Sequence, residues 1–277
     1  MRSHSTAVIS PKAKIADDVE IGPYAIVEDH VTLAKGVKVY ANAYITGSAQ
    51  IGENTEIHMG AVIGHVPQDW SFKKETRSAV RIGKNNLIRE YATIHRGSKE
   101  GSATVIGDNN FIMAHSHVAH DCQIGNRVVL ANGVLLAGYV TVEDMVFISG
   151  NVVVHQFVRI GKLTMIGGLA RISKDVPPFM LAKGESRIYA VNVVGLRRAG
   201  YTTEQRENIR QVFKILYRSG MNFSQALDVL KQQPPSAEGT QIIQFIESAK
   251  RGICGGVIKK DDLEEALEEE LNEPTQE

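Results

Sequence analysis

Aliphatic side chains recur at every sixth position through most of the chain, and a small or slender residue follows four positions after each of them. A period of six matches neither an α-helix nor one long strand, but it fits a short strand followed by a corner. Three such units close a triangular coil of about 18 residues, so the sequence predicts a parallel β-helix whose aliphatic residues point inward. The aliphatic positions stay in phase from Ile9 to Ile63, from Ile82 to Ile94 and from Ile106 to Ile172.

Two interruptions of the repeat predict loops that leave the β-helix. Residues 64–81 are too polar and irregular for a coil, and they contain Gln68, Asp69 and Trp70, the only tryptophan of the chain. Loops on a rigid scaffold often carry function, so this loop is either a binding flap or a purely structural excursion. A second loop is expected at residues 96–104, because Glu100 stands at an aliphatic position and an unpaired carboxylate is costly to bury.

A different organisation follows the repeat, which should end at Pro177 and Pro178 because neither residue can donate to a β-ladder. We expect a linker over residues 179–200, which contain Gly184, Gly195 and Gly200. A helix that Thr203 caps and Gly220 ends should follow, and then two more helices at about 224–232 and 237–251. The tail from Asp261 holds nine acidic residues and no basic one. The predicted organisation is a β-helix domain over residues 1–187, an α-helical domain over 188–258 and an acidic tail over 259–277.

Charge and composition limit the classes of partner. With 31 basic and 31 acidic residues, no global field favours nucleic acid or a membrane surface. No apolar run is long enough to span a bilayer and no apolar leader precedes the repeat, so we expect a soluble, cytoplasmic protein without an integral membrane segment. Cys122 and Cys254 give no disulfide framework. Twelve Lys/Arg against four Asp/Glu lie between Arg159 and Arg218, which favours an acidic partner there.

The most concentrated chemistry lies in one predicted column of corner residues. His120, Gly138 and Gln156 are one coil apart and should stack in steps of about 4.8 Å. Gly138 permits close approach of a substrate and can offer its N–H to a developing oxyanion. His120 can take a proton from a hydroxyl, because its ordinary pKa lies near neutrality. Asp121 is the candidate to orient His120, but sequence neighbours on a strand point to opposite faces, so their contact requires the geometry of a corner.

A metal site is the competing interpretation of the histidines. His115, His117, His120 and His155 fall on neighbouring coils, and His115 and His120 have the five-residue separation found in the γ-class carbonic anhydrases. A zinc site with three protein ligands is not defined by the spacing, since Gln156 occupies the position two coils after His120. We therefore predict no metal, and keep a zinc hydratase and a catalytically silent β-helix that acts as an assembly module as alternatives.

Several segments of the chain resemble the acyl-ACP:UDP-N-acetylglucosamine O-acyltransferase (LpxA) family, a group of hexapeptide-repeat acyltransferases. They occur in the order typical of that family and span residues 8 to 252, leaving only the acidic tail without a counterpart. The segments are Gln68-Asp69, Thr93-Ile94-His95-Arg96-Gly97, His117-Val118-Ala119-His120-Asp121-Cys122, Gly125-Asn126-Arg127, Leu136-Ala137-Gly138, Val154-His155-Gln156-Phe157, Asp175-Val176-Pro177-Pro178, Gly195-Leu196-Arg197-Arg198 and Tyr217-Arg218-Ser219-Gly220.

The resemblance implies the left-handed form of the β-helix, followed by a small α-helical domain, and a homotrimer with active sites between neighbouring chains. It also implies transfer of a 3-hydroxyacyl chain from acyl carrier protein to the 3-hydroxyl of a UDP-sugar, UDP-N-acetylglucosamine, as the first step of lipid A synthesis. No metal or dissociable cofactor is implied, because the acyl group arrives on the phosphopantetheine of the carrier.

Roles for individual residues follow from the same resemblance. His120 is the implied general base, Asp121 its orienting partner and the Gly138 N–H the oxyanion donor. For the sugar, the implied contacts are Asp69, His117, His155 and Gln156, and for the nucleotide they are Asn192 and Arg198. Gly168 would limit the length of the acyl chain. Gln68 and Tyr139 are further candidate substrate-binding residues.

This sequence departs from the family pattern at four positions in or near the segments that carry the resemblance. Tyr139 stands where the family has histidine, Val194 replaces an acidic residue, Ala199 replaces a basic one, and Ser71 stands where the first loop usually has lysine. The base and the oxyanion donor are unaffected. The substituent at the acceptor's 3-position stays open, so a UDP-sugar with a 3-amino group or another modification is an alternative acceptor.

Overall fold

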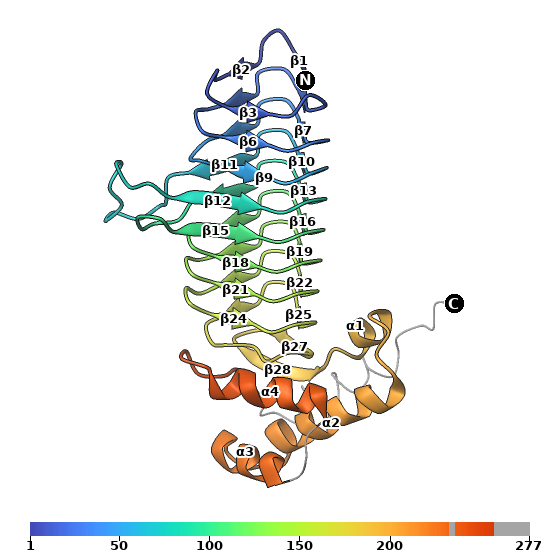
Figure 1. Ribbon diagram of the computed structural model, residues 1–277. Coiled ribbons are helices and arrows are strands. Elements are labelled where there is room, and N and C mark those ends of the chain that lie inside the picture. The colour runs from blue at the N-terminus through green and yellow to red at the C-terminus, as the bar shows by residue number, and fades with distance from the viewer. Residues whose placement is uncertain (233–235, 258–277) are drawn as a thin grey trace.

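The repeat folds into a three-sided prism of stacked parallel strands, and helices cover one end of it (Figure 1). This is a computed structural model, and it describes residues 1–232 and 236–257. Successive strands of the chain pass to the first, second and third sheet in turn, which gives the parallel β-helix that the period of six predicts. We call the edge between the first and second sheets the first corner, that between the second and third the second corner, and that between the third and first the third corner.

The strands of each sheet are short and are stacked in register. The first sheet consists of β1 (Arg2–Ser3), β4 (Glu20–Ile21), β7 (Lys38–Val39), β10 (Glu56–Ile57), β13 (Leu87–Ile88), β16 (Phe111–Ile112), β19 (Val129–Leu130), β22 (Phe147–Ile148), β25 (Met165–Ile166), β27 (Met180–Lys183), β28 (Arg187–Val191) and β29 (Gly255–Gly256). The second consists of β2 (Val8–Ile9), β5 (Ile26–Val27), β8 (Tyr44–Ile45), β11 (Val62–His65), β14 (Thr93–His95), β17 (His117–Val118), β20 (Leu135–Leu136), β23 (Val153–Val154) and β26 (Arg171–Ile172). The third consists of β3 (Lys14–Ile15), β6 (Thr32–Leu33), β9 (Gln50–Ile51), β12 (Ala79–Ile82), β15 (Ala103–Ile106), β18 (Gln123–Ile124), β21 (Thr141–Val142) and β24 (Arg159–Ile160).

Inward-pointing aliphatic residues form the core of the prism. Ile57, Ile94 and Leu136 are fully buried, one on each of three different coils, as the period predicts. The chain turns at each corner through a residue with a left-handed backbone, such as Asp121 at φ 59° and Tyr139 at φ 62°. This conformation is uncommon outside glycine, and here the hydrogen bonds between adjacent coils hold it in place. Cys122 and Cys254 are buried free thiols, as predicted.

Both predicted loops leave the prism at the second corner, and they project from it side by side (Figure 1). They are shorter than expected, since β11 continues to His65 and β12 begins at Ala79. The longer strands arise because Ala79–Ile82 pairs over four residues with Ala103–Ile106. Glu100 is exposed, and its carboxylate accepts a hydrogen bond from the backbone N–H of Arg77, 2.9 Å away.

The linker predicted for residues 179–200 is wrong. β27 and β28 form an antiparallel hairpin that continues the first sheet past the last coil, and a short helix, α1 (Val193–Arg198), follows. Gly184, at φ 56°, forms the turn between the two strands, Gly195 lies within α1, and Gly200, at φ 83°, follows that helix. The predicted division between residues 187 and 188 falls within β28, and the predicted acidic tail over 259–277 lies outside the described residues.

Three further helices cover the end of the prism (Figure 1). They are α2 (Thr203–Arg218), α3 (Phe223–Gln232) and α4 (Ala237–Glu247), the last of which ends before the predicted residue 251. Thr202, and not Thr203, caps α2, because its hydroxyl accepts from the Gln205 N–H while the Gln205 side chain accepts from the Thr202 N–H. Among the described residues, no helix has the length and hydropathy required to cross a bilayer.

Candidate active site

The predicted column of corner residues is present at the second corner, directly below the two loops. The Tyr139 N–H donates to the His120 carbonyl at 3.0 Å, and the Phe157 N–H donates to the Gly138 carbonyl at 3.1 Å, which fixes one coil upon the next. A Cβ atom added to Gly138 would lie 2.6 Å from His120 Cε1 and 2.7 Å from His120 Nε2. Glycine is therefore required at position 138 for the imidazole to lie where it does.

His120 and Asp121 form a hydrogen-bonded pair, although they are neighbours in sequence. His120 Nδ1 lies 2.9 Å from Asp121 Oδ2. The left-handed backbone of Asp121 turns the chain at this point, so the two side chains meet instead of pointing to opposite faces. Both side chains are largely buried, with exposed fractions of 16% and 8%.

Hydrogen bonds keep Asp121 ionised despite its burial. Burial is the largest influence on the carboxyl and by itself would raise its pKa. Hydrogen bonds from Ser98, Ser102 and His120 together outweigh burial, so the pKa of Asp121 lies below its usual value. Because a carboxylate only accepts, the Nδ1 of His120 carries a proton, and Nε2 is left free to take one.

Gly138 also supplies an uncommitted donor. Its backbone N–H has no hydrogen-bond acceptor among the residues that the structure describes, whereas the N–H groups of Ala137 and Tyr139 both bond to adjacent coils. An uncommitted N–H beside a histidine base is the arrangement that can stabilise a developing oxyanion.

A row of histidines on the second sheet lies beside this pair. His117 Nδ1 is 2.7 Å from the Thr93 hydroxyl, and the ring of His95 meets that of His117 edge to face at 4.9 Å. Burial, with a contribution from nearby His120, lowers the pKa of His117, and burial together with the other histidines lowers the pKa of His95 to about 4. Both rings are therefore uncharged near neutrality, and each can donate one hydrogen bond and accept another.

Sequence reasoning did not select His95 as a site residue. The loops that follow β11 and β14 interrupt the spacing of 18, so the pairing of His95 with His65 and its packing on His117 cannot be read from the sequence. The available signal was its place in the segment Thr93-Ile94-His95-Arg96-Gly97.

The first loop brings Asp69 into the same region. Asp69 Oδ1 accepts from both the N–H and the hydroxyl of Ser71, each at 2.8 Å, and these bonds, with a smaller influence of nearby His120, lower the pKa of Asp69. Phe72 packs under the guanidinium of Arg96 at 5.4 Å and so ties the first loop to the second. Gln68 and Trp70 are exposed, and Trp70 is fully so.

Tyr139, His155 and Gln156 complete the second corner. The Tyr139 ring meets His120 edge to face at 5.2 Å. His155 and Gln156 are exposed on the next coil, and His155 Nδ1 lies 3.2 Å from the Gln156 carbonyl oxygen. The structure therefore gathers Asp69, His117 and these three residues around the His120–Asp121 pair.

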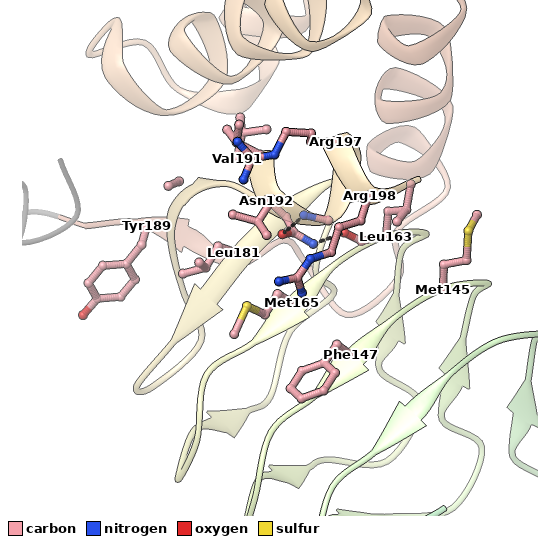
Figure 2. A pocket seen from close by; sticks show the side chains of 14 residues that line it. Met145, Phe147, Leu163, Met165, Leu181, Tyr189, Val191, Asn192, Arg197 and Arg198 are labelled. Atoms are coloured by element: carbon pink, nitrogen blue, oxygen red, sulfur yellow. Dashed lines mark hydrogen bonds between the residues drawn. The ribbon is translucent and has the colours of Figure 1, made fainter. Parts of the chain in front are cut away.

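Three predicted site residues, Gly168, Asn192 and Arg198, do not lie at the second corner. Gly168 is at the first corner, where the Leu169 N–H bonds to the Gly150 carbonyl in the coil above. Asn192 and Arg198 line a cavity of about 360 Å³ between the first sheet and α1, near the third corner, and the Arg198 side chain extends into it (Figure 2). Within one chain these three residues do not meet His120.

The side chain of Asn192 has a structural role at this cavity, because it caps α1 and bonds to the first sheet's neighbouring turn. Its Oδ1 accepts from the Gly195 N–H at 3.0 Å and so caps α1, and its Nδ2 donates to the Leu163 carbonyl at 2.8 Å. The apolar wall opposite is formed by the first sheet, with Phe147, Met165 and Leu181. Asn192 thus fixes the start of the helix that presents Arg198.

The histidines do not converge on a metal site. His115 is at the first corner, where it stacks on Tyr91 with ring centroids 5.4 Å apart, and is thus separated from His120 by a whole face of the prism. Over residues 1–232 and 236–257, no three His, Cys, Asp or Glu side chains are grouped so that they could hold a metal ion.

Comparison with known proteins places the chain in a family. Residues 175–254 match the family described as UDP N-acetylglucosamine O-acyltransferase, domain 2, and residues 30–65 and 103–138 match the bacterial transferase hexapeptide family. A relative named acyl-[acyl-carrier-protein]-UDP-N-acetylglucosamine O-acyltransferase, from Thermodesulfovibrio yellowstonii, is 47% identical over 254 residues, covering 91% of this chain and 98% of the relative.

Solved structures agree with that match. The UDP-N-acetylglucosamine acyltransferase of Francisella novicida has a TM-score of 0.89 and 37% identity, covering 94% of this chain and 96% of its own. LpxA from Bacteroides fragilis has a TM-score of 0.86 and 41% identity, covering 90% and 98%. The expected left-handed β-helix with a small helical domain is thereby confirmed. By fold and by sequence, the chain belongs to the acyl-ACP:UDP-N-acetylglucosamine O-acyltransferase family.

Proposed function

We propose that the protein transfers a 3-hydroxyacyl chain from acyl carrier protein to the 3-hydroxyl of UDP-N-acetylglucosamine, the first step of lipid A biosynthesis. The observation that carries the proposal is the His120–Asp121 pair stacked on an uncommitted Gly138 N–H. Base, orienting carboxylate and oxyanion donor are the three parts that acyl transfer to an alcohol requires.

The reaction follows from these positions. His120 Nε2 takes the proton of the sugar hydroxyl while its oxygen attacks the thioester carbonyl, and the charge that develops on the carbonyl oxygen is stabilised by the Gly138 N–H. The tetrahedral intermediate then collapses, the bond from carbon to sulfur breaks, and the imidazolium returns its proton to the departing thiolate. Atoms and charges balance without a metal or a dissociable cofactor, so we propose that none is used.

The acceptor would be held by polar groups around the second corner. Asp69, His117, His155 and Gln156 lie there, and the neutral His117 imidazole suits hydrogen bonding to a hydroxyl. Asn192 and Arg198 would contact the nucleotide, and Gly168 the acyl chain, all at other corners of the prism. We infer that a neighbouring prism completes each site, which supports a homotrimer.

The acyl carrier protein, an acidic partner, would dock on the basic end of the molecule. Arg171, Lys174, Arg187, Arg197 and Arg198 are exposed there, around the last coil and α1. Membership of this family implies a cytoplasmic protein, and we propose that compartment.

Mass spectrometry of the products tests this function most directly. Purified protein would be given a panel of acyl carrier proteins with acyl chains of different length, together with UDP-N-acetylglucosamine or its 3-amino analogue. The expected product is the 3-O-acyl ester. Preferential acylation of the analogue would replace the hydroxyl by an amine as the acceptor, and no product from either sugar would overturn the proposal.

A further inference from the structure

A chain of hydrogen bonds extends from the His120–Asp121 pair into the second loop. Asp121 Oδ2 lies 2.9 Å from His120 Nδ1, and it also accepts from the Ser98 N–H at 2.9 Å and from the Ser98 hydroxyl at 2.7 Å. Ser98 Oγ in turn lies 2.9 Å from the hydroxyl of Tyr139. The base is thereby joined to a residue of the second loop and to a residue of the next coil.

The donors and acceptors in this series of hydrogen bonds are consistent with only one direction of donation. An ionised carboxylate only accepts, so Ser98 gives its single hydroxyl proton to Asp121. Tyr139 must then donate its own proton to Ser98 Oγ, because the Ser98 proton is already used. Donation therefore passes from Tyr139 through Ser98 to Asp121, which also accepts the hydrogen bond from His120 Nδ1. In this arrangement His120 Nε2 is unprotonated.

Ring contacts hold Tyr139 in the position that its hydrogen bond to Ser98 requires. Its ring stacks on Phe157 at 4.8 Å with an interplanar angle of 13°, and it meets the His120 imidazole at 90°. The Lys99 ammonium lies 5.6 Å from the ring centroid. A ring fixed between Phe157 and His120 presents its hydroxyl to Ser98 and also limits rotation of the imidazole.

We propose that Ser98 and Tyr139 are positioning residues for the base, which they orient through Asp121. Ser98 fixes the carboxylate with two donors, Tyr139 fixes the Ser98 hydroxyl, and the result is one tautomer and one orientation of His120. The assignment rests on the proposed function, since it concerns the base of that reaction. It also gives Tyr139 a role other than the substrate contact expected from the sequence, because its proton is donated to Ser98.

Kinetics of Ser98→Ala and Tyr139→Phe test the proposal. We expect Ser98→Ala to lower kcat roughly ten- to hundred-fold, the effect of losing a charge-assisted hydrogen bond, and Tyr139→Phe to lower it less. KM for the UDP-sugar should change less than about two-fold, since substrate contacts persist. The acid limb of the kcat/KM profile should move to higher pH, because a carboxylate that has lost the Ser98 hydroxyl donor and keeps only the backbone N–H interacts more strongly with a protonated imidazole. Ser98→Thr keeps the hydroxyl and should restore most of kcat.

Two comparisons separate positioning from a general structural effect. Tyr91→Phe is the matched control: Tyr91 also has a left-handed backbone and a stacked ring, but it lies at the first corner and should show no change. In an Asp121→Ala background, Ser98→Ala should cause no further loss, because its effect passes through that carboxylate. A loss that adds in full to that of Asp121→Ala, or a fall in kcat with an unmoved pH profile, would overturn the proposal.

Nitrogen NMR of the full-length protein with ¹⁵N-labelled histidine gives a readout that needs no turnover. The His120 signals, assigned by their absence in His120→Ala, should show the tautomer protonated at Nδ1, and Ser98→Ala should shift the population toward Nε2. An identical tautomer in both proteins contradicts the positioning role even if acyl transfer is observed. The expected shift in a protein that forms no acyl product would instead contradict the proposed function alone.

Discussion

At the scale of single residues, His120 and Gly138 constrain each other. The imidazole occupies the space in which any side chain at position 138 would begin, so one position cannot change without moving the other. The glycine also leaves its N–H uncommitted, and both features fit the reaction that we propose. Position 168 is different, because a Cβ atom there would meet only ordinary contacts, at 3.5 Å from Ser149 Oγ and 3.6 Å from the Gly150 carbonyl oxygen.

Replacing the base should abolish most of the activity without affecting the fold. We expect His120→Ala to lower kcat about 10²- to 10⁴-fold, which is the usual contribution of a general base, and Asp121→Ala to cost less. His115→Ala, a histidine at the first corner, is the control and should retain activity. Steady-state assays measure kcat, and circular dichroism checks that the fold is retained. Near-normal turnover with unchanged pH dependence in His120→Ala would show that another group is the base.

The glycine at position 168 should determine the length of the acyl chain. Its ordinary surroundings tolerate a side chain, so Gly168→Met should fold and should shorten the preferred donor. Each buried CH₂ is worth about 0.8 kcal/mol, so blocking two to four of them should change selectivity roughly ten- to a few hundred-fold. Competition between carriers with C10 and C14 3-hydroxyacyl chains measures this ratio. Asn132→Met, in the same column two coils away, is the control, and an unchanged ratio in Gly168→Met would mean that Gly168 does not line the chain.

At the scale of elements, the end of the prism is where local signals were least reliable. The glycines of residues 179–200 suggested a linker, but β27 and β28 extend the first sheet, with Phe179 fully buried beneath them. The helical segment is then joined back to the prism, since Asp175 exchanges backbone hydrogen bonds with Gly252 and Cys254, each at 2.9 Å. Such pairing between residues far apart in sequence leaves no local pattern.

The Asp175 carboxyl at this junction should make stability depend on pH. It is fully buried, and burial, the main cause, raises its pKa above the usual value. A carboxyl whose pKa is higher in the folded than in the unfolded state contributes stability below its unfolded pKa of about 4, and that contribution is lost as pH rises through the folded value. Asp175→Asn should therefore have a higher Tm relative to the unaltered protein at pH 8 than at pH 4.

Thermal unfolding followed by circular dichroism at several pH values measures this difference. The control is Asp29→Asn, because hydrogen bonds from Lys12 and Ser10 lower the pKa of exposed Asp29 and any effect should have the opposite sign. A constant difference in Tm between Asp175→Asn and the unaltered protein across this range would contradict the assignment of a raised pKa.

At the scale of the whole molecule, the residues of the proposed site lie at different corners of a single prism. His120 lies at the second corner, whereas Arg198 lies near the third and Gly168 at the first. Leu135 and Val153 are exposed on the second sheet near the base, and Leu169 is 80% exposed beside Gly168. Large apolar side chains at these places are suited to contact with another copy of the chain.

We expect a homotrimer in solution. Light scattering coupled to size exclusion should give about three times the chain mass of 30.3 kDa, because closed rotational symmetry buries equivalent faces on every copy. A mass of one chain at working concentrations would exclude sites shared between prisms.

Mixed trimers should reveal which residues are shared. If His120 and Arg198 act from different prisms, inactive His120→Ala and weakened Arg198→Ala chains, refolded together, should recover about a quarter of the activity, since random mixing leaves that share of interfaces intact. Refolding each variant alone is the control. If the activity of the mixed trimers is no higher than the mean of the two variants refolded alone, His120 and Arg198 of each site come from the same chain.

The sequence by itself determined the prism, the two loops and the column that contains the base. A repeat of six defines its own register, so the spacing alone pairs residues 18 positions apart, such as His117 and Leu135. Only the tertiary structure could show that Ser98 bonds to both Asp121 and Tyr139 and that His95 packs on His117, because irregular loops interrupt the register there. The hairpin of β27 and β28 and the cavity around Asn192 were likewise decided by contacts distant in sequence. Regular repetition makes distant contacts predictable from local sequence, and wherever the repetition stops, packing alone settles which side chains meet.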